Sequence, residues 1–315
     1  MSKVWFVTGS SRGLGRALVE VALEAGDRVA ATARDPDRLQ DLVDSYGDAV
    51  LPLRLDVTDF DAAARVVAEA EKTFGRIDVV INNAGYSDLG SFEDTTIDSF
   101  RRQIDTNFYG VVNVTKAVVP VLREQACGHI FQVSSLSVRL SGPGLTAYEG
   151  AKWAVAGFSS GLAHEIAPFG VKVTVLEPGG MRTDWAGSSM TIPQPSTPYE
   201  PAIGAFAELV RAGSGHEANS ARRVAQVVRD LACRDDAPLR LLLGVDAVPL
   251  AQQAAQELAA CDEAWREVSL SVAARPPTGS AHDRCQRDGR TIIECNRHGV
   301  AAPVRRPVGH HERHA

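Results

Sequence analysis

The stretch TGSSRGLG (Thr8–Gly15) follows a short apolar run, VWFV, at residues 4–7. Its glycines stand at positions 9, 13 and 15 in the spacing G-x-x-x-G-x-G, which differs from the common dinucleotide fingerprint G-x-G-x-x-G. The first glycine permits a tight turn, and the other two let backbone and ligand approach closely. A helix beginning at Leu14 would offer its unpaired N–H groups to a pyrophosphate. The stretch therefore predicts either a phosphate loop or an ordinary turn between strand and helix.

Outward from this stretch, short β-branched apolar runs alternate with longer segments of helical periodicity. The expected strands are 4–7, 28–33, 50–55, 77–82, 129–135, 171–177 and 239–244. The expected helices are roughly 14–25, 36–46, 59–74, 96–125, 146–168, 220–233 and 248–268. Strands that are apolar on both faces indicate a parallel sheet covered by helices on each side. The predicted fold class is α/β: a Rossmann-type, doubly wound parallel sheet of about seven strands.

The predicted domain organisation is a single domain at residues 1–270 with an irregular C-terminal tail. Within the domain, about 184–220 is rich in Ser, Thr and Pro and has no period, which is typical of a functional loop. Residues 271–315 hold five of the eight histidines and many arginines without amphipathic order. We therefore expect a disordered tail.

Composition excludes several classes of function. A net charge of −6 with pI near 5.8 gives no basic face for nucleic acid. No apolar run approaches the ~18 residues of a transmembrane helix, and the first residues do not resemble a signal peptide. The five cysteines form no C-x-x-C pair, and Cys285, Cys295 and His298 match no standard zinc spacing, so no metal is expected. These features indicate a cytoplasmic protein without nucleic-acid or membrane partners.

Further motifs accompany the glycine loop. LDVTD (55–59), NNAG (82–85) and PGGMRT (178–183) each stand at or just after the end of an expected strand, and Tyr148-x-x-x-Lys152 opens a later helix. In this order and spacing, from about Lys3 to at least Trp185, they resemble the short-chain dehydrogenase/reductase family in its ordinary, non-extended branch. The extended branch, with its epimerases and dehydratases, usually carries T-G-x-x-G-x-x-G, which the glycines here do not match.

The resemblance implies four catalytic residues, Asn107, Ser135, Tyr148 and Lys152. Tyr148 and Lys152 share one helix face, and a nearby ammonium should lower the phenol pKa from its usual ~10. The alternative is a solvent-facing Tyr/Lys pair. The family spacing selects Ser135 over Ser134 to orient the substrate oxygen. Asn107 would hold a water that links the lysine to bulk solvent.

The end of the second expected strand indicates which cofactor is bound. NAD-preferring members of such folds carry an acid there, whereas this chain has Ala33 followed by Arg34. An arginine suits a 2′-phosphate, and Arg12 would reach the same phosphate from the glycine loop. We therefore expect NADP(H). In the alternative, Asp35 takes the acid's role and Arg12 is merely solvated.

The resemblance extends the cofactor site along the chain. Asp56 would contact the adenine amine, with a helix cap as its alternative role. Pro178 and Gly179 would turn the backbone toward the nicotinamide amide, and Thr183 would bond the pyrophosphate. The expected cofactor-binding residues are Gly9, Ser11, Arg12, Gly13, Leu14, Gly15, Arg34, Asp56, Val57, Asn83, Ala84, Gly85, Tyr148, Lys152, Pro178, Gly179 and Thr183.

The implied function is an NADP(H)-dependent carbonyl reductase or alcohol dehydrogenase that acts on a small carbonyl or alcohol substrate. The expected substrate lining is mostly apolar, so a hydrophobic ketone or secondary alcohol is favoured over a charged acid. Its members are Tyr86, Leu89, Phe92, Leu136, Leu140, Leu145, Met181, Trp185 and Met190. Family members usually dimerise through the long helices, so we expect a homodimer or homotetramer. The alternative is a non-catalytic NADP(H)-sensing or scaffold protein, against which the four intact catalytic positions argue.

Overall fold

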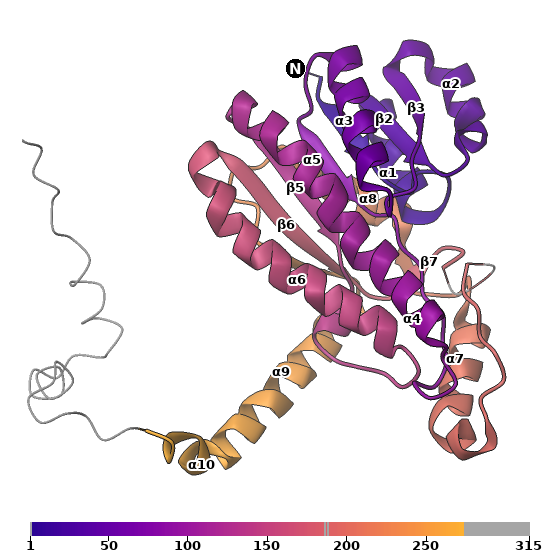
Figure 1. The fold of residues 1–315 in the computed structure, drawn as a ribbon, viewed down its shortest axis with the longest axis vertical. Helices are drawn as coiled ribbons and strands as arrows, with labels where there is room; N and C mark the ends of the chain where they lie inside the picture. Colours follow the sequence, from indigo (N-terminus) through magenta and orange to yellow (C-terminus); the bar gives the residue numbers. More distant parts are fainter. Residues whose placement is uncertain (1, 186, 188, 274–315) are drawn as a thin grey trace, which may run out of the picture. The chain divides into compact units, whose positions relative to one another are not determined.

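The central element of the structure is a seven-stranded, all-parallel sheet (Figure 1). The structure is a computed structural model that describes residues 2–185, 187 and 189–273. The strands are β1 (Val4–Val7), β2 (Arg28–Ala33), β3 (Val50–Arg54), β4 (Val79–Asn82), β5 (Gly128–Val133), β6 (Val171–Pro178) and β9 (Arg240–Leu243). Their order across the sheet, β3-β2-β1-β4-β5-β6-β9, reverses direction at β1, which confirms the predicted doubly wound class.

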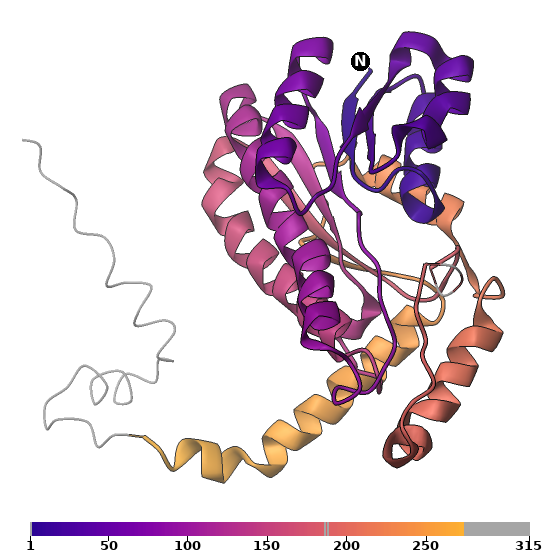
Figure 2. The same cartoon turned by 45° about the vertical axis from the view of Figure 1, so that its right-hand side comes forward.

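Helices cover both faces of this sheet (Figures 1 and 2). The helices of the described residues are α1 (Gly13–Glu24), α2 (Gln40–Tyr46), α3 (Phe60–Phe74), α4 (Ile97–Ile104), α5 (Gly110–Gln125), α6 (Thr146–Ile166), α7 (Ala205–Gly213), α8 (Ala221–Leu231), α9 (Ala247–Ala264) and α10 (Arg266–Leu270). Helices α1, α2 and α8 pack on one face, and α3, α5 and α6 pack on the other.

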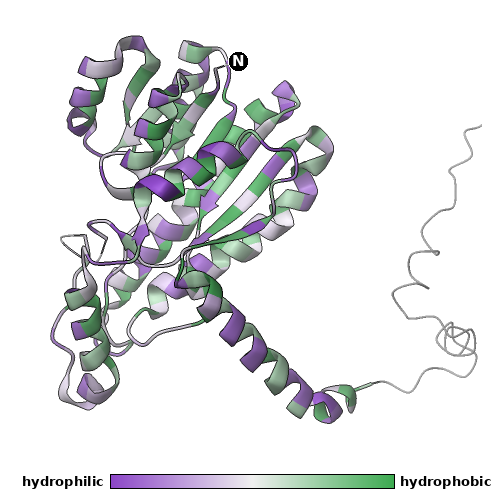
Figure 3. Cartoon of the chain, turned by 180° about the vertical axis from the view of Figure 1, so that it is seen from behind, coloured by the Kyte–Doolittle hydropathy of each residue, from purple (hydrophilic) through white to green (hydrophobic). Residues whose placement is uncertain are grey.

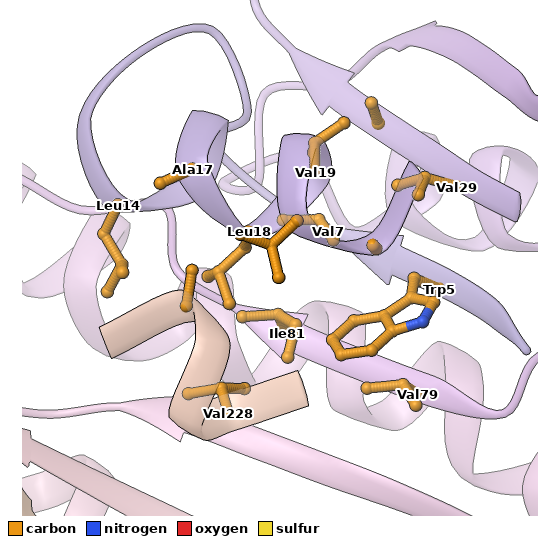
Figure 4. Close-up of a cluster of buried hydrophobic side chains, with 14 of the residues drawn as sticks. Trp5, Val7, Leu14, Ala17, Leu18, Val19, Val29, Val79, Ile81 and Val228 are labelled. Carbon is orange, nitrogen blue, oxygen red and sulfur yellow. The ribbon is translucent and has the colours of Figure 1, made fainter. Parts of the chain in front are cut away.

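Strand β1 shows how the two cores are divided. Trp5 and Val7 pack against α1 and α8 (Figure 4), whereas Val4 and Phe6 pack against α3 and α5. Successive side chains of a strand point to opposite faces, so a strand covered on both sides must be apolar throughout. This is why the strands stand out as hydrophobic segments in the sheet (Figure 3).

Two segments differ from the sequence prediction. The expected helix 96–125 is divided by a π-helical turn at Asp105–Tyr109. The expected irregular loop 184–220 contains helix α7 and the strand β8 (Asn219–Ser220), which pairs in parallel with β7 (Met181–Arg182). The prediction of an irregular segment was therefore wrong for these elements. Helix α7 is short and follows a run that contains proline and glycine, so the sequence shows no extended helical periodicity that would predict it.

Contacts within the chain divide it into two compact units, residues 1–257 and residues 258–315. The described residues end at 273, so the expected disordered tail lies outside them from residue 274 onward, together with its cysteines and histidines. Among the helices of the described part, none has the length and apolar character needed to cross a membrane.

His129 is a buried titratable group at the centre of the sheet. Its Nε2 lies 2.9 Å from Thr174 Oγ1, and because that hydroxyl donates to Pro238 O, the imidazole is the donor. The ring also stacks on Phe131 at 3.9 Å between centroids. Nδ1 has no partner among the described residues. Burial lowers the His129 pKa to about 3, since a second N–H would have no acceptor.

This histidine predicts acid sensitivity of the fold. Between about pH 6.5 and pH 3 the unfolded chain binds a proton that the folded protein excludes, so stability falls as the pH falls through this window. The wild-type free energy of unfolding should drop by up to about 1.4 kcal/mol per pH unit more than that of His129→Phe. Urea unfolding between pH 7 and pH 4 measures the difference, with the exposed His164→Gln as control. Equal slopes for wild type and His129→Phe would contradict this account.

Candidate active site

One large cleft lies beyond the carboxyl ends of the strands, where ligands bind in doubly wound sheets. Its volume is about 1290 Å³, above the ~300–1,000 Å³ of ordinary ligand pockets, so a dinucleotide and a second molecule fit together. Every residue expected to bind cofactor or to act in catalysis lines it, except Gly15. Segments far apart in the sequence thus meet in one place.

The glycine loop is shaped by close backbone contacts. Gly9 has φ +67°, and a Cβ there would stand 2.9 Å from the Cα of Ala84. The amide of Asn83 donates to the carbonyls of Thr8 at 2.9 Å and Gly9 at 3.2 Å. A Cβ at Gly15 would overlap the Gly9 carbonyl. Gly15 therefore sets the approach of α1 to β1 and does not form part of the cleft wall.

The start of α1 suits an anion. No side chain caps this helix at Arg12, its first turn carries no acidic residue, and its first residues, Gly13 and Leu14, line the cleft. Thr183 faces the loop, its Cβ 3.7 Å from the position a Cβ of Gly13 would take. The residues present therefore fit the pyrophosphate of a dinucleotide.

Three arginines line the cofactor end of the cleft: Arg12, Arg34 and Arg38. Arg34 is exposed, directly after the buried Ala33. Arg12 contacts Asp184 at 3.2 Å in the substrate loop, and Arg38 contacts Asp35 at 3.3 Å. Sequence reasoning missed Arg38, although its position one helical turn after Arg34 was a usable signal.

The hydrogen bonds of the segment after β3 decide between the two roles considered for Asp56. Asp56 Oδ1 accepts from the backbone N–H of Thr58 at 3.0 Å and from its hydroxyl at 2.8 Å. The cap of α3 is Asp59, which accepts from Ala62 N at 2.8 Å. The helix-cap role considered for Asp56 or Thr58 is therefore wrong, and Asp56 lines the cleft.

The tyrosine and serine of the catalytic set lie together. Ser135 lies close enough to the Tyr148 phenol to act to lower its pKa, but burial dominates and raises that pKa to about 12. Ser134 instead points into the fold and donates to Lys152 O at 3.2 Å. Ser135 is thus the serine beside the phenol.

Lys152 is buried beneath this pair. Its Nζ donates to Val133 O at 2.8 Å and lies 5.5 Å from the centroid of the Tyr148 ring. Burial lowers the Lys152 pKa to about 8. The sequence predicted that the Lys152 ammonium would lower the Tyr148 pKa. That lowering is not found in the protein without its cofactor, because burial disfavours both the phenolate of Tyr148 and the ammonium of Lys152.

Asn107 lies in the π-helical turn, where it is fully buried. Its amide nitrogen donates to Tyr86 O at 2.8 Å and Gln103 O at 2.9 Å, and its oxygen accepts from Tyr86 N at 3.2 Å. A Cβ at Gly85 would stand 2.5 Å from that oxygen. The side chain therefore holds the end of the NNAG segment, and a relay water would have to use main-chain atoms.

A family model described as short chain dehydrogenase matches residues 3–191. The chain belongs to the short-chain dehydrogenase/reductase family. Oxidoreductase BOA17 of Botryotinia fuckeliana is 54% identical over 274 residues, which cover 87% of this chain and 100% of that protein. A short-chain dehydrogenase of Streptomyces avermitilis is 35% identical with a TM-score of 0.81, covering 86% of this chain and 98% of its own.

Two further solved structures carry a cofactor. A short-chain dehydrogenase of Burkholderia cenocepacia in complex with NADP is 26% identical, with a TM-score of 0.63 over 87% of this chain and 98% of its own. A Burkholderia phymatum member in complex with NAD shares the fold at 22% identity, with a TM-score of 0.71 over 88% of this chain and 97% of its own. The chain is therefore an oxidoreductase of this family, and these two proteins bind NAD or NADP on the fold that it shares with them.

The substrate end of the cleft in this short-chain dehydrogenase/reductase is mostly apolar. Seven of the nine expected lining residues are present there. The other two were predicted wrongly: Leu89 is fully buried in a cluster with Leu145 and Met190, and Phe92 is exposed against Phe100. Sequence reasoning missed the wall formed by α7 (Phe206, Leu209 and Val210) and the carboxylates of Glu149, Glu217 and Asp246.

Gly15→Ala tests the packing of the loop. The added methyl group must push α1 away from the Gly9 carbonyl, so we expect a loss of about 1–3 kcal/mol in the free energy of unfolding and weaker dinucleotide binding. The control is Gly161→Ala, in the exposed middle of α6 with no atom within 4 Å of the new Cβ. It should be neutral or stabilising by up to about 1 kcal/mol. Thermal unfolding and a dinucleotide titration measure both variants, and an unaffected Gly15→Ala would refute the packing role.

Proposed function

We propose that this short-chain dehydrogenase/reductase transfers a hydride between NADP(H) and the carbonyl or secondary alcohol carbon of a small, mostly apolar substrate. The observation that carries the proposal is the buried phenol of Tyr148 with Ser135 and Lys152 beside it, in the same cleft as the uncapped start of α1. A sensor or scaffold has no need for a buried acid beside its cofactor.

In the direction of reduction, the bound NADPH supplies the hydride to the carbonyl carbon. Tyr148 donates its phenolic proton to the carbonyl oxygen, and its pKa of about 12 keeps that proton in place at neutral pH. Ser135, which lines the cleft beside the same phenol, donates a hydrogen bond to that oxygen and orients it. The ammonium of Lys152 stabilises the phenolate that remains, until a proton from solvent restores the phenol.

The preference for NADP(H) rests on charge at the end of β2. Ala33 is small and buried where NAD-preferring folds carry an acid, and the exposed Arg34 follows it. Arg12 and Arg38 line the same end of the cleft. A guanidinium there binds a 2′-phosphate bidentately and gains little from a ribose hydroxyl.

The substrate preference rests on the opposite end. Leu140, Trp185, Met190 and Phe206 form an apolar wall near Tyr148, and the Trp185 ring lies 5.6 Å from the Tyr148 ring. The lining cations, the three arginines and Lys152, belong to the cofactor and catalytic parts. An uncharged ketone or alcohol fits this wall better than a carboxylic acid.

The proposal includes a homodimer or homotetramer in the cytoplasm. Tyr109 and Trp153 expose half of their surface on adjoining helical segments, as residues of a subunit interface do in an isolated chain. Light scattering coupled to gel filtration measures the assembly, and a monomer at micromolar concentration would contradict this part.

Tyr148→Phe tests the chemistry. Loss of the phenolic proton should lower kcat at least about 10²–10⁴-fold, while the Kd for NADPH changes by less than twofold, because the ring and its packing are kept. NADPH oxidation over a panel of ketones and quinones supplies the assay, with the exposed Tyr109→Phe as control. Tight NADPH binding without turnover of any substrate in the wild type would favour the sensor.

Arg34→Ala tests the cofactor preference. Removing a charge-assisted bond should weaken NADPH binding about 10- to 100-fold and leave NADH binding within twofold. The control is Arg65→Ala, an exposed arginine of α3 outside the cleft. Fluorescence titration of both cofactors measures the ratio. Tighter binding of NADH than NADPH by the wild type would overturn the preference.

A further inference from the structure

The turn after β6, Pro178–Gly180, is gripped by two side chains from distant segments. Asp246, between β9 and α9, accepts from the backbone N–H of Gly180 at 2.8 Å. Asn219, at the start of β8, donates to the carbonyl of Gly180 at 2.7 Å. Both polar groups of one peptide residue are therefore fixed from outside the turn.

The two side chains also bind each other. Asn219 Nδ2 donates to Asp246 Oδ1 at 2.6 Å, and Asn219 Oδ1 accepts from Val245 N at 2.9 Å. The amide of Asn219, which is buried, thus uses both donors and its acceptor. A polar network in which every donor and acceptor is matched permits one geometry and penalises others.

Glycines make room for this network. A Cβ at Gly179 would stand 2.6 Å from Asp246 Cγ, and a Cβ at Gly244 would stand 2.7 Å from Asn219 Nδ2. Gly244 also has φ +142°, which L side chains rarely adopt. The carboxylate and the amide therefore occupy the space that side chains would otherwise fill on both sides of the turn.

The network lies at the cleft. Gly179, Gly180 and Asp246 line it together with Tyr148 and Lys152. We infer that Asp246 and Asn219 are positioning residues, which hold the 178–180 turn in the shape that receives the nicotinamide half of the dinucleotide. This inference rests on the proposed function, in which the same turn faces the nicotinamide amide.

The network is sensitive to an isosteric change. Asp246→Asn keeps the size of the side chain but replaces one acceptor oxygen with an NH₂ group. In the wild type both carboxylate oxygens of Asp246 accept, one from Gly180 N–H and the other from Asn219 Nδ2. The new NH₂ group of the variant therefore faces one of these two donors. The turn must shift to separate the two donors. In the double variant with Asn219→Asp, residue 246 donates and residue 219 accepts, which restores the contact between them but turns an acceptor toward the Gly180 carbonyl that Asn219 donates to in the wild type.

Titration with two ligands tests the inference. NADPH spans the whole site, whereas 2′,5′-ADP contains the adenosine and 2′-phosphate and lacks the nicotinamide. We expect Asp246→Asn to weaken NADPH binding at least tenfold and 2′,5′-ADP binding less than twofold. The double variant should bind NADPH no better than Asp246→Asn, because it also loses the hydrogen bond to Gly180 O. Asp236→Asn, which breaks only an exposed pair with Arg234, should change neither ligand.

Three outcomes would overturn the inference. Unchanged NADPH affinity in Asp246→Asn removes the positioning role, and an equal loss for both ligands makes the network a general support of the fold. Wild-type protein that binds neither ligand removes the proposed function itself, and the inference with it. If Asp246→Asn does not fold, Asn219→Ser tests the inference in its place, because it keeps the hydrogen bond between Gly180 and Asp246. This variant should weaken NADPH binding about threefold and leave the affinity for 2′,5′-ADP unchanged.

Discussion

The contact between Gly15 and the Gly9 carbonyl determines how α1 leaves β1, and the cleft is arranged around it. A side chain at Gly15 would separate helix from strand, and one at Gly9 would collide with the backbone of Ala84. Because they are this close, the N-terminus of α1 points beyond the sheet edge, and Asn83 can reach both carbonyls of the turn from β4. The phosphate end of the cleft is therefore made by backbone packing, and its specificity comes from the arginines placed around it.

Burial governs the catalytic end in a similar way. It raises the pKa of Tyr148 to about 12 and lowers the pKa of Lys152 to about 8, so burial opposes the charged form of each group, although Lys152 is still mainly an ammonium at neutral pH. The proton on the phenol is thus held by the environment, and Ser135 acts in the opposite sense. A buried acid that keeps its proton at neutral pH is suited to donate it to a developing alkoxide.

The sequence predicted the strands and the motif residues because both are local signals. A strand covered on two faces must be apolar throughout, and the motif residues stand where such strands end. Side-chain direction was less accessible: Leu89 and Phe92 looked like wall residues, yet one is buried in a separate cluster and the other is exposed. Helix α7 was missed because, among its own residues, only Ala207 is fully buried, which leaves almost no period to detect.

Contacts between distant segments could not be predicted at all. Nothing in one sequence places Asp246 against Gly180, or shows that the amide of Asn107 is consumed by its neighbours. Nor does the continuous period of 96–125 reveal a π-helical turn, since one inserted residue leaves the apolar pattern on both sides intact.

The ion pair of Arg12 and Asp184 joins the phosphate loop to the first residues of the substrate loop. An anion bound by Arg12 competes with Asp184 for the same guanidinium. Such competition is reciprocal by thermodynamic linkage. A bound anion weakens the ion pair between Arg12 and Asp184, and breaking that ion pair raises the affinity of Arg12 for the anion by the same factor. Binding of the dinucleotide at one end of the cleft would then loosen the chain at Asp184, at the other end of the same cleft.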